Sequence, residues 1–111
     1  TEKEQKEETA ERVTKRATGY KTDENIVLIG KKPVMNYVVA CLTFFNSGAT
    51  KVVVKARGRA ISRAVDTVEL LRRAFMKSLE LQGITIFTEE VTRTEGQKAN
   101  VSAIEIAVTK P

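Results

Sequence analysis

The stretch Ile26-Val-Leu-Ile-Gly-Lys-Lys-Pro-Val-Met-Asn36 joins two apolar runs through a glycine, two adjacent lysines and a proline. Residues 26–29 form a short continuous apolar run, which is typical of a strand that is covered on both sides or central in its sheet. Gly30 permits a sharp turn, and Pro33 suits the first turn of a helix, where its missing N–H costs nothing. The stretch therefore predicts a strand, a tight turn that carries two positive charges, and a helix.

The segments that follow continue this alternation of strands and helices. Residues 34–46 predict a helix that is apolar around most of its circumference, and the glycine of Asn46-Ser-Gly48 suits its end. Residues 51–56 predict a second strand. Over residues 61–81, apolar side chains recur at spacings of three and four, which predicts a second helix that ends at Gln82-Gly83. This apolar stripe consists of Ile61, Ala64, Val65, Val68, Leu71, Phe75 and Leu79.

The last third of the chain predicts a long hairpin. Residues 84–91 and 101–108 are expected to form its two strands, and the polar connection between them contains Gly96. Two strands joined through a helix are expected to run parallel in one sheet. The order β-α-β-α-β-β therefore predicts an α/β domain of the α+β two-layer kind, in which two helices pack on a mixed sheet.

Positive charge is concentrated in this domain. Residues 1–25 hold six Lys or Arg and seven Asp or Glu, whereas residues 26–111 hold 13 Lys or Arg and seven Asp or Glu. Residues 1–24 are too poor in large apolar groups to fold alone, so we predict a flexible tail, with a docked helix as the alternative. Residues 25–111 form the predicted domain, whose positive charge suits a polyanion or an anionic surface.

Residues with catalytic or metal-binding chemistry are few. The chain has no histidine and one cysteine, so it has no imidazole base and no internal disulfide. Cys41 lies among apolar residues of the first helix, which is typical of a small buried hydrophobe. Asp66 and Glu69 share a helix face, but nearby arginines favour ion pairs over a metal site. Gly30-Lys31-Lys32 lacks the spacing of a phosphate-binding P-loop. We expect no enzymatic activity, no cofactor and no metal.

The cellular location can be approached from the same composition. The sequence has no signal peptide and no apolar run of about 18 residues. Its lone cysteine is compatible with a reducing compartment. We therefore expect a soluble cytoplasmic protein with no membrane partner.

Five basic residues are expected to meet at one edge of the sheet. Lys31 and Lys32 follow the first strand, and Lys55, Arg57 and Arg59 lie at the end of the second strand. The carboxyl ends of two parallel strands lie at the same edge, beside the amino end of the first helix with its free N–H groups. Such a cluster suits phosphate groups, with a solvated loop that carries incidental lysines as the alternative.

Several motifs resemble those of the Alba family of archaeal chromatin proteins, over roughly residues 25–110. They match in order and spacing, and are Gly30-Lys-Lys-Pro-Val-Met-Asn-Tyr37, Lys55-Ala-Arg-Gly-Arg-Ala-Ile61, Ala64-Val-Asp-Thr-Val-Glu69 and Ser102-Ala-Ile-Glu-Ile106. The resemblance implies a compact domain similar to the carboxy-terminal domain of translation initiation factor three. It also implies a homodimer, or a heterodimer with a paralogue, that binds double-stranded DNA and often RNA in association with the chromosome.

The same resemblance implies roles for individual residues. Lys31 and Lys32 match the family's core nucleic-acid lysines, and Arg57 and Arg59 match basic contacts beside them. Lys31 also matches a lysine that serves as an acetylation switch. Phe75 matches the aromatic residue through which neighbouring dimers pack along DNA, although its place in the apolar stripe also suits an ordinary core residue.

Three features depart from the family's pattern. The tail is longer than the usual short leader. Residues 76–83 predict a continued helix, where some members have an irregular, proline-containing turn. The hairpin tip matches an arm that reaches toward a minor groove, but its Arg93 and Lys98 are accompanied by Glu95, which weakens the attraction to phosphate.

The residue types also predict how a nucleic acid would be held. Basic residues on loops, with Tyr37 as the only aromatic among the basic motifs, favour phosphate contacts over base stacking or base readout. We therefore predict binding of duplex DNA, and of RNA, with little sequence preference and strong salt dependence, which would coat and compact the chromosome. The alternatives are an RNA-binding module of an RNA-processing ribonucleoprotein and a protein-interaction domain whose charge serves only solubility.

Overall fold

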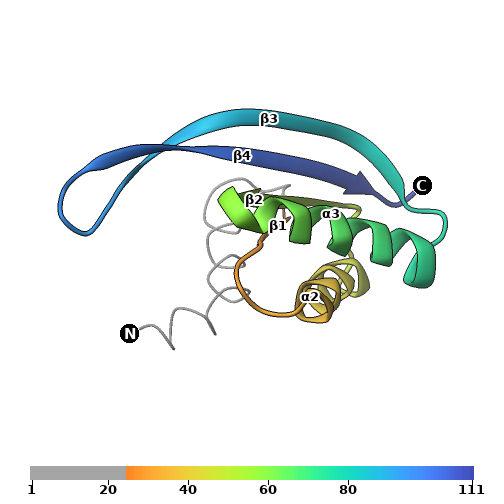
Figure 1. The fold of residues 1–111 in the computed structure, drawn as a ribbon. Helices are drawn as coiled ribbons and strands as arrows, with labels where there is room; N and C mark the ends of the chain where they lie inside the picture. Colours follow the sequence, from red (N-terminus) through yellow and green to blue (C-terminus); the bar gives the residue numbers. More distant parts are fainter. Residues whose placement is uncertain (1–24) are drawn as a thin grey trace.

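Residues 25–111 are described by the structure, a computed structural model (Figure 1). The elements are β1 (Asn25–Leu28), α2 (Val34–Asn46), β2 (Lys51–Arg57), η1 (Gly58–Ala60), α3 (Ile61–Leu70), η2 (Leu71–Phe75), β3 (Glu80–Thr92) and β4 (Lys98–Thr109). η1 is a 3₁₀ turn, and η2 is a π-helical turn that prolongs α3. The predicted order of elements and the α+β class with a mixed sheet are confirmed. The predicted tail, residues 1–24, lies outside the described residues.

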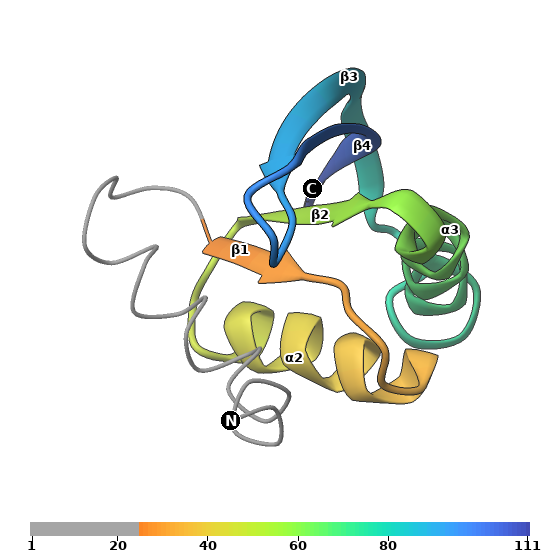
Figure 2. The ribbon, with the colours of Figure 1, turned by 60° about the vertical axis from the view of Figure 1, so that its left-hand side comes forward.

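The four strands form one sheet in the order β1-β2-β4-β3. β1 and β2 run parallel, as the crossover through α2 predicted, and the other two pairings are antiparallel. α2 and α3 lie on the same side of the sheet (Figures 1 and 2). None of the helices within residues 25–111 combines the length and apolarity needed to cross a membrane.

β1 lies at an edge of the sheet, so the prediction of a central or doubly covered strand is wrong. Val27 and Ile29 are buried against the helices, whereas Ile26 and Leu28 are only half-buried. The helices cover one face of the sheet. A continuous apolar run does not distinguish a strand covered on one face from a strand covered on both.

The hydrophobic core lies between the two helices and three of the strands. Its members come from β1 (Val27 and the following Ile29), α2 (Tyr37, Val38, Cys41, Phe45), β2 (Val52, Val54, Ala56), α3 and η2 (Ala64, Val68, Leu71), Leu79, and β4 (Ile104, Ile106, Val108). The thiol of Cys41 is fully buried, which confirms its predicted place in the core. Burial raises the pKa of Cys41 to about 12, so the thiol stays neutral and unreactive at neutral pH.

The second helix is shorter than predicted, because the helical segment ends at Phe75 and not at Leu81. Met76 leaves the helical conformation, and its N–H donates to the carbonyl oxygen of Leu71 over 2.8 Å. Leu79 is buried, but in the turn before β3 and not on the helix. Residues 76–81 are mostly good helix formers, yet pairing of β3 with β4 overrides that local preference.

The hairpin strands are longer than the predicted 84–91 and 101–108, and they extend past the rest of the domain. Arg57 pairs with Ala103, so residues 98–102 of β4 continue beyond the carboxyl end of β2 with only β3 beside them. At about 3.3 Å per residue this overhang is about 16 Å long. In Figure 1 the overhang is the part of the curved β3–β4 hairpin that extends on the left beyond β2. We call residues 80–102 the arm, and residues 25–79 with 103–111 the body.

Apolar side chains of β3 are left uncovered on the side where the helices lie. Leu81, Ile84 and Ile86 pair with Val108, Ile106 and Ile104, whose side chains belong to the core. The three β3 residues therefore face the same way as the core, but they are 39%, 57% and 75% exposed. We call Leu81, Ile84 and Ile86 the arm's apolar face.

Candidate nucleic-acid interface

The Lys31–Lys32 loop is held in place by two side chains of the body. The hydroxyl oxygen of Tyr37 accepts hydrogen bonds from the N–H groups of Gly30, at 2.9 Å, and of Lys32, at 3.0 Å. The guanidinium of Arg63 donates to the carbonyl oxygen of Gly30 at 2.8 Å. Tyr37 is only 2% exposed, so its hydroxyl is fixed by the core beneath it. The two lysines therefore project from a backbone that the body has already ordered.

A close approach to Tyr37 favours glycine at position 30. A Cβ atom at this position would lie 3.3 Å from the Tyr37 hydroxyl oxygen, which is tighter than ordinary packing. The sequence indicated a turn at Gly30, but it did not identify Tyr37 or Arg63 as residues that hold the loop. One indication was available: a buried tyrosine in an apolar helix needs a partner for its hydroxyl group.

Basic residues from two segments lie at one end of the sheet. Lys31 and Lys32 follow β1, and Arg59 lies in η1, which follows β2. The two strands are parallel, so these segments leave the sheet at the same end, and the arm extends beyond that end. Within residues 25–111, no ion pair involves Lys31, Lys32 or Arg59. Lys31 and Arg59 are exposed and Lys32 is half-buried.

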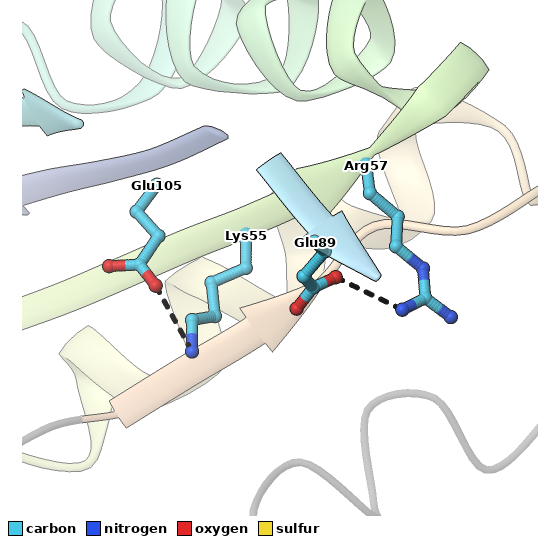
Figure 3. A network of polar contacts seen from close by, with 4 residues as sticks. All are labelled: Lys55, Arg57, Glu89 and Glu105. Atoms are coloured by element: carbon cyan, nitrogen blue, oxygen red, sulfur yellow. Dashed lines mark hydrogen bonds and ion pairs between the residues drawn. The ribbon is translucent and has the colours of Figure 1, made fainter. Parts of the chain in front are cut away.

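Lys55 and Arg57 belong to the same region but lie on a face of the sheet and not in a loop. β2 continues through Arg57, and both residues alternate with Val54 and Ala56 of the core. Their side chains therefore lie on the face opposite the helices. Lys55 pairs with Glu105 at 3.2 Å, and Arg57 pairs with Glu89 at 3.1 Å (Figure 3). The expected group of five cations is thus divided into three in loops and two that are paired with carboxylates.

The tip of the arm carries the remaining two candidate residues. Arg93 begins the turn and Lys98 begins β4. The N–H of Arg93 donates to the Gln97 carbonyl oxygen at 2.7 Å, and Gly96 closes the turn with a φ of 85°, which favours glycine. Both basic side chains are exposed, as is that of Glu95. The arm presents them at the same end of the sheet as the Lys31–Lys32 loop.

Phe75 ends the helical segment and is 46% exposed. This exposure does not fit the alternative of an ordinary core residue. The neighbouring core positions of the stripe are filled by Val68 and Leu71, which are buried.

Of the two acidic residues of α3, Glu69 forms the kind of ion pair that the sequence predicted. Glu69 accepts a hydrogen bond from Arg72 at 2.9 Å, while Asp66 is exposed. Within residues 25–111, no group of three or more His, Cys, Asp or Glu side chains is arranged to hold a metal ion.

Comparison with known proteins assigns this chain to a family. The model of the Alba family matches residues 25–88. A protein of Methanocella arvoryzae named DNA/RNA-binding protein Alba is 53% identical over 89 residues, covering 80% of this chain and 93% of that protein. The chain belongs to the Alba family. A second Alba relative, DNA/RNA-binding protein Alba 1 of Archaeoglobus fulgidus, is 58% identical over 87 residues, covering 78% of this chain and 97% of that protein.

Solved structures of Alba proteins have the same fold. Alba from Thermoplasma volcanium is similar with a TM-score of 0.73 and 44% sequence identity, over 78% of this chain and 100% of that chain. ALBA1 from Trypanosoma brucei is similar with a TM-score of 0.63 and 28% identity, over 82% of this chain and 72% of that chain. The resemblance to Alba that the motifs predicted is thereby confirmed.

Proposed function

We propose that this protein binds duplex nucleic acid, both DNA and RNA, at the end of the sheet that carries the Lys31–Lys32 loop and the tip of the arm. The observation that carries the proposal is the pre-ordered loop. Tyr37 and Arg63 fix the backbone on either side of Lys31, so the two lysines can meet phosphates without first ordering the chain. The names of the two relatives from archaea, which state DNA and RNA binding, support the same function.

The contacts are made to phosphates. Lysine and arginine side chains at this end come from loops and from an arm, and the amide side chains of the described helices are limited to Asn36 and Asn46, near the two ends of α2. Phosphate contacts position a protein on a duplex without reading its sequence. Affinity is therefore similar on different sequences and falls steeply with salt, because each contact releases counterions.

The functional unit is a dimer. The arm's apolar face is exposed on a strand that lies at the edge of the sheet, and exposed apolar patches of this kind mark interaction sites. A second copy that covers this face would bury it by two-fold symmetry and bring two Lys31–Lys32 loops to one duplex. A heterodimer with a paralogue would use the same surface.

In the cell, such dimers coat and compact DNA as a chromosome-associated protein of the cytoplasm. Arg57 and Arg59 contribute contacts beside the loop, and the tip with Arg93 and Lys98 reaches toward a minor groove. Phe75 provides the contact between neighbouring dimers. Acetylation of Lys31, which is exposed, removes one charge and lowers affinity.

The test is a salt titration of the affinity of the full chain for duplex DNA and duplex RNA, each in several sequences. We expect log K to fall linearly with log salt for both, at a slope of about −0.9 for each phosphate contacted on DNA. Affinity should vary little among sequences. A response to polyanions that is flat with salt would contradict the proposal and favour a protein-interaction domain.

The runner-up function is an RNA-binding module of an RNA-processing ribonucleoprotein. Both curated relatives carry RNA as well as DNA in their names. Competition between duplex DNA and a structured RNA of equal length separates the two. Displacement of bound RNA only by a large excess of DNA would favour the ribonucleoprotein.

A further inference from the structure

Two of the basic residues near the interface are already paired with carboxylates of the same chain. Lys55 and Glu105 are directly opposite each other on β2 and β4, and their charged atoms lie 3.2 Å apart. Arg57 is opposite Ala103, and its guanidinium reaches past β4 to Glu89 on β3, at 3.1 Å. Figure 3 shows both cations extending from β2 to the same side, each toward its own carboxylate.

These pairs lie at the surface. The Lys55 and Glu105 side chains are 36% and 33% exposed, and those of Arg57 and Glu89 are 59% and 43% exposed. Solvent and salt screen such pairs, so each contributes little to folding and is easily exchanged for another ionic partner. Lys31, in the loop, forms no ion pair with the carboxylates that the structure describes, so a phosphate would displace none of them there.

The surroundings of Arg57 can admit an anion. A cleft of about 390 Å³ is lined by Lys55, Arg57, Glu89 and Phe87, and by Leu28 and Ile29 at the end of β1. Ile29 lies directly before the Gly30–Lys32 segment. The cleft therefore extends from Lys55 and the Arg57–Glu89 pair to the residue that precedes the Gly30–Lys32 segment.

We propose that Glu89 and Glu105 compete with backbone phosphates of the nucleic acid for Arg57 and Lys55, and so set its affinity and salt dependence. The inference rests on the proposed function. A phosphate that contacts one of these cations must first displace the carboxylate beside it, which then turns to solvent. Because of this competition, Lys55 and Arg57 form their phosphate contacts less completely than unpaired cations would, and they contribute less to binding.

The test replaces each carboxylate by its neutral isostere. Glu89→Gln and Glu105→Gln keep the size of the side chain and one oxygen that can accept a hydrogen bond, but they leave Arg57 or Lys55 without its charged partner among residues 25–111. We expect each variant to bind duplex DNA more tightly than the unmodified chain and with a steeper salt dependence. A fully gained phosphate contact steepens the slope by about 0.9, which is roughly an eightfold change in affinity per tenfold change in salt.

Glu69→Gln is the matched control. It makes the same change in net charge, and it also removes the carboxylate of a surface ion pair, between Glu69 on α3 and Arg72 on η2. If all three variants steepen the slope equally, the effect is one of net charge and the proposal is overturned. Weaker binding by Glu89→Gln would also overturn it, because the carboxylate would then be orienting Arg57 for phosphate.

A double-mutant cycle tests whether the gain in affinity of Glu89→Gln depends on its ion-pair partner Arg57. In an Arg57→Ala background, Glu89→Gln should gain no affinity, because no cation remains to be released. An equal gain in both backgrounds would contradict the proposal. If the unmodified chain binds no duplex, the proposed function itself fails. If it binds and the glutamine variants match it, only the present inference fails.

Discussion

The body and the arm of this molecule differ in how far they bury their apolar side chains. In the body, apolar side chains of β1, β2, β4 and two helices bury one another, and Val38, Val54 and Leu71 have no exposed surface. The arm is also rich in β-branched residues, but Ile84 and Ile86 remain 57% and 75% exposed. They lie on the face of the sheet on which their β4 partners, Ile106 and Ile104, contribute to the core.

This difference shows that the body buries its apolar residues within one chain, whereas the arm does not. The body orders its own Lys31–Lys32 loop through Tyr37 and Arg63. The arm carries an apolar face that its own chain leaves uncovered within residues 25–111, together with two basic residues at its tip. We infer that the body supplies a preformed phosphate-binding loop, and that the arm supplies the surface for a second copy.

The largest expected loss of stability is for a core substitution in the body. Leu71→Ala should lower the free energy of unfolding by about 2–5 kcal/mol, because it leaves a cavity in a packed core. Ile86→Ala in the arm removes a side chain that is already mostly in water, so it should cost far less in a monomeric chain. Urea unfolding at several protein concentrations measures both. Equal losses at every concentration would contradict the distinction between body and arm.

Dimerisation through the arm's apolar face should be sensitive to an added charge more than to a change in side-chain size. Placing carboxylates there, with Ile84→Glu and Ile86→Glu together, should raise the dimer dissociation constant by roughly 100-fold or more, since each charge would have to be buried in the interface. Sedimentation velocity reports the oligomeric state. Thr92→Glu is the control, because it adds a charge to the same face of β3 at the exposed end of the strand. A stable dimer in the double variant would place the interface elsewhere.

Removing the Tyr37 hydroxyl should loosen the loop while keeping the core. Tyr37→Phe leaves the N–H groups of Gly30 and Lys32 without their acceptor, which should cost about 1 kcal/mol of stability. We expect faster hydrogen exchange at these two amides and weaker duplex binding. Thr43→Val removes a hydroxyl that donates to the Val39 carbonyl oxygen on the exposed side of α2, and it should change neither. Unchanged exchange in Tyr37→Phe would show that the loop is ordered by other contacts.

Phe75 lies at the end of the body's helical segment and should have the smallest effect on folding. Its ring is 46% exposed, so Phe75→Ala should change stability by about 1 kcal/mol or less. If the ring joins neighbouring dimers, binding to a duplex one dimer long should be unaltered, while cooperativity on long DNA falls. Binding isotherms on short and long duplexes, with a thermal melt, separate the outcomes. Retained cooperativity would remove Phe75 from the contact.

The sequence predicted the body better than the arm, for physical reasons. Apolar periodicity and turn residues are local, and they located α2, β2 and the start of α3 to within a residue or two. The end of the second helix is determined by contacts that are distant in the sequence. Residues 76–81 favour a helix by themselves, and only pairing with β4 converts the last of them to strand. For the same reason the hairpin strands were predicted too short, and the edge position of β1 was missed.

The candidate site was predicted in its residue types and less well in its arrangement. Lys31, Lys32 and Arg59 lie at the end of the sheet where parallel strands place them. The partners of Lys55 and Arg57 depend on the register of three strands, which brings Glu105 and Glu89 from far along the chain. Tyr37 and Arg63 were missed as loop-holding residues because their hydrogen bonds go to backbone atoms of the loop. A buried tyrosine hydroxyl needs a partner, but the sequence does not say which partner it finds.

The most direct test of the account is the salt slope of duplex binding by the double variant Lys31→Ala/Lys32→Ala. We predict weaker binding and a slope flatter by about 0.9 for each lost phosphate contact, with the fold and dimer unchanged. The matched control is Lys77→Ala/Lys110→Ala, which removes two charges from segments at the opposite end of the sheet. It should leave the slope close to that of the unmodified chain. An unchanged slope in the loop variant, or an equal change in the control, would contradict the claim that this loop holds the nucleic acid.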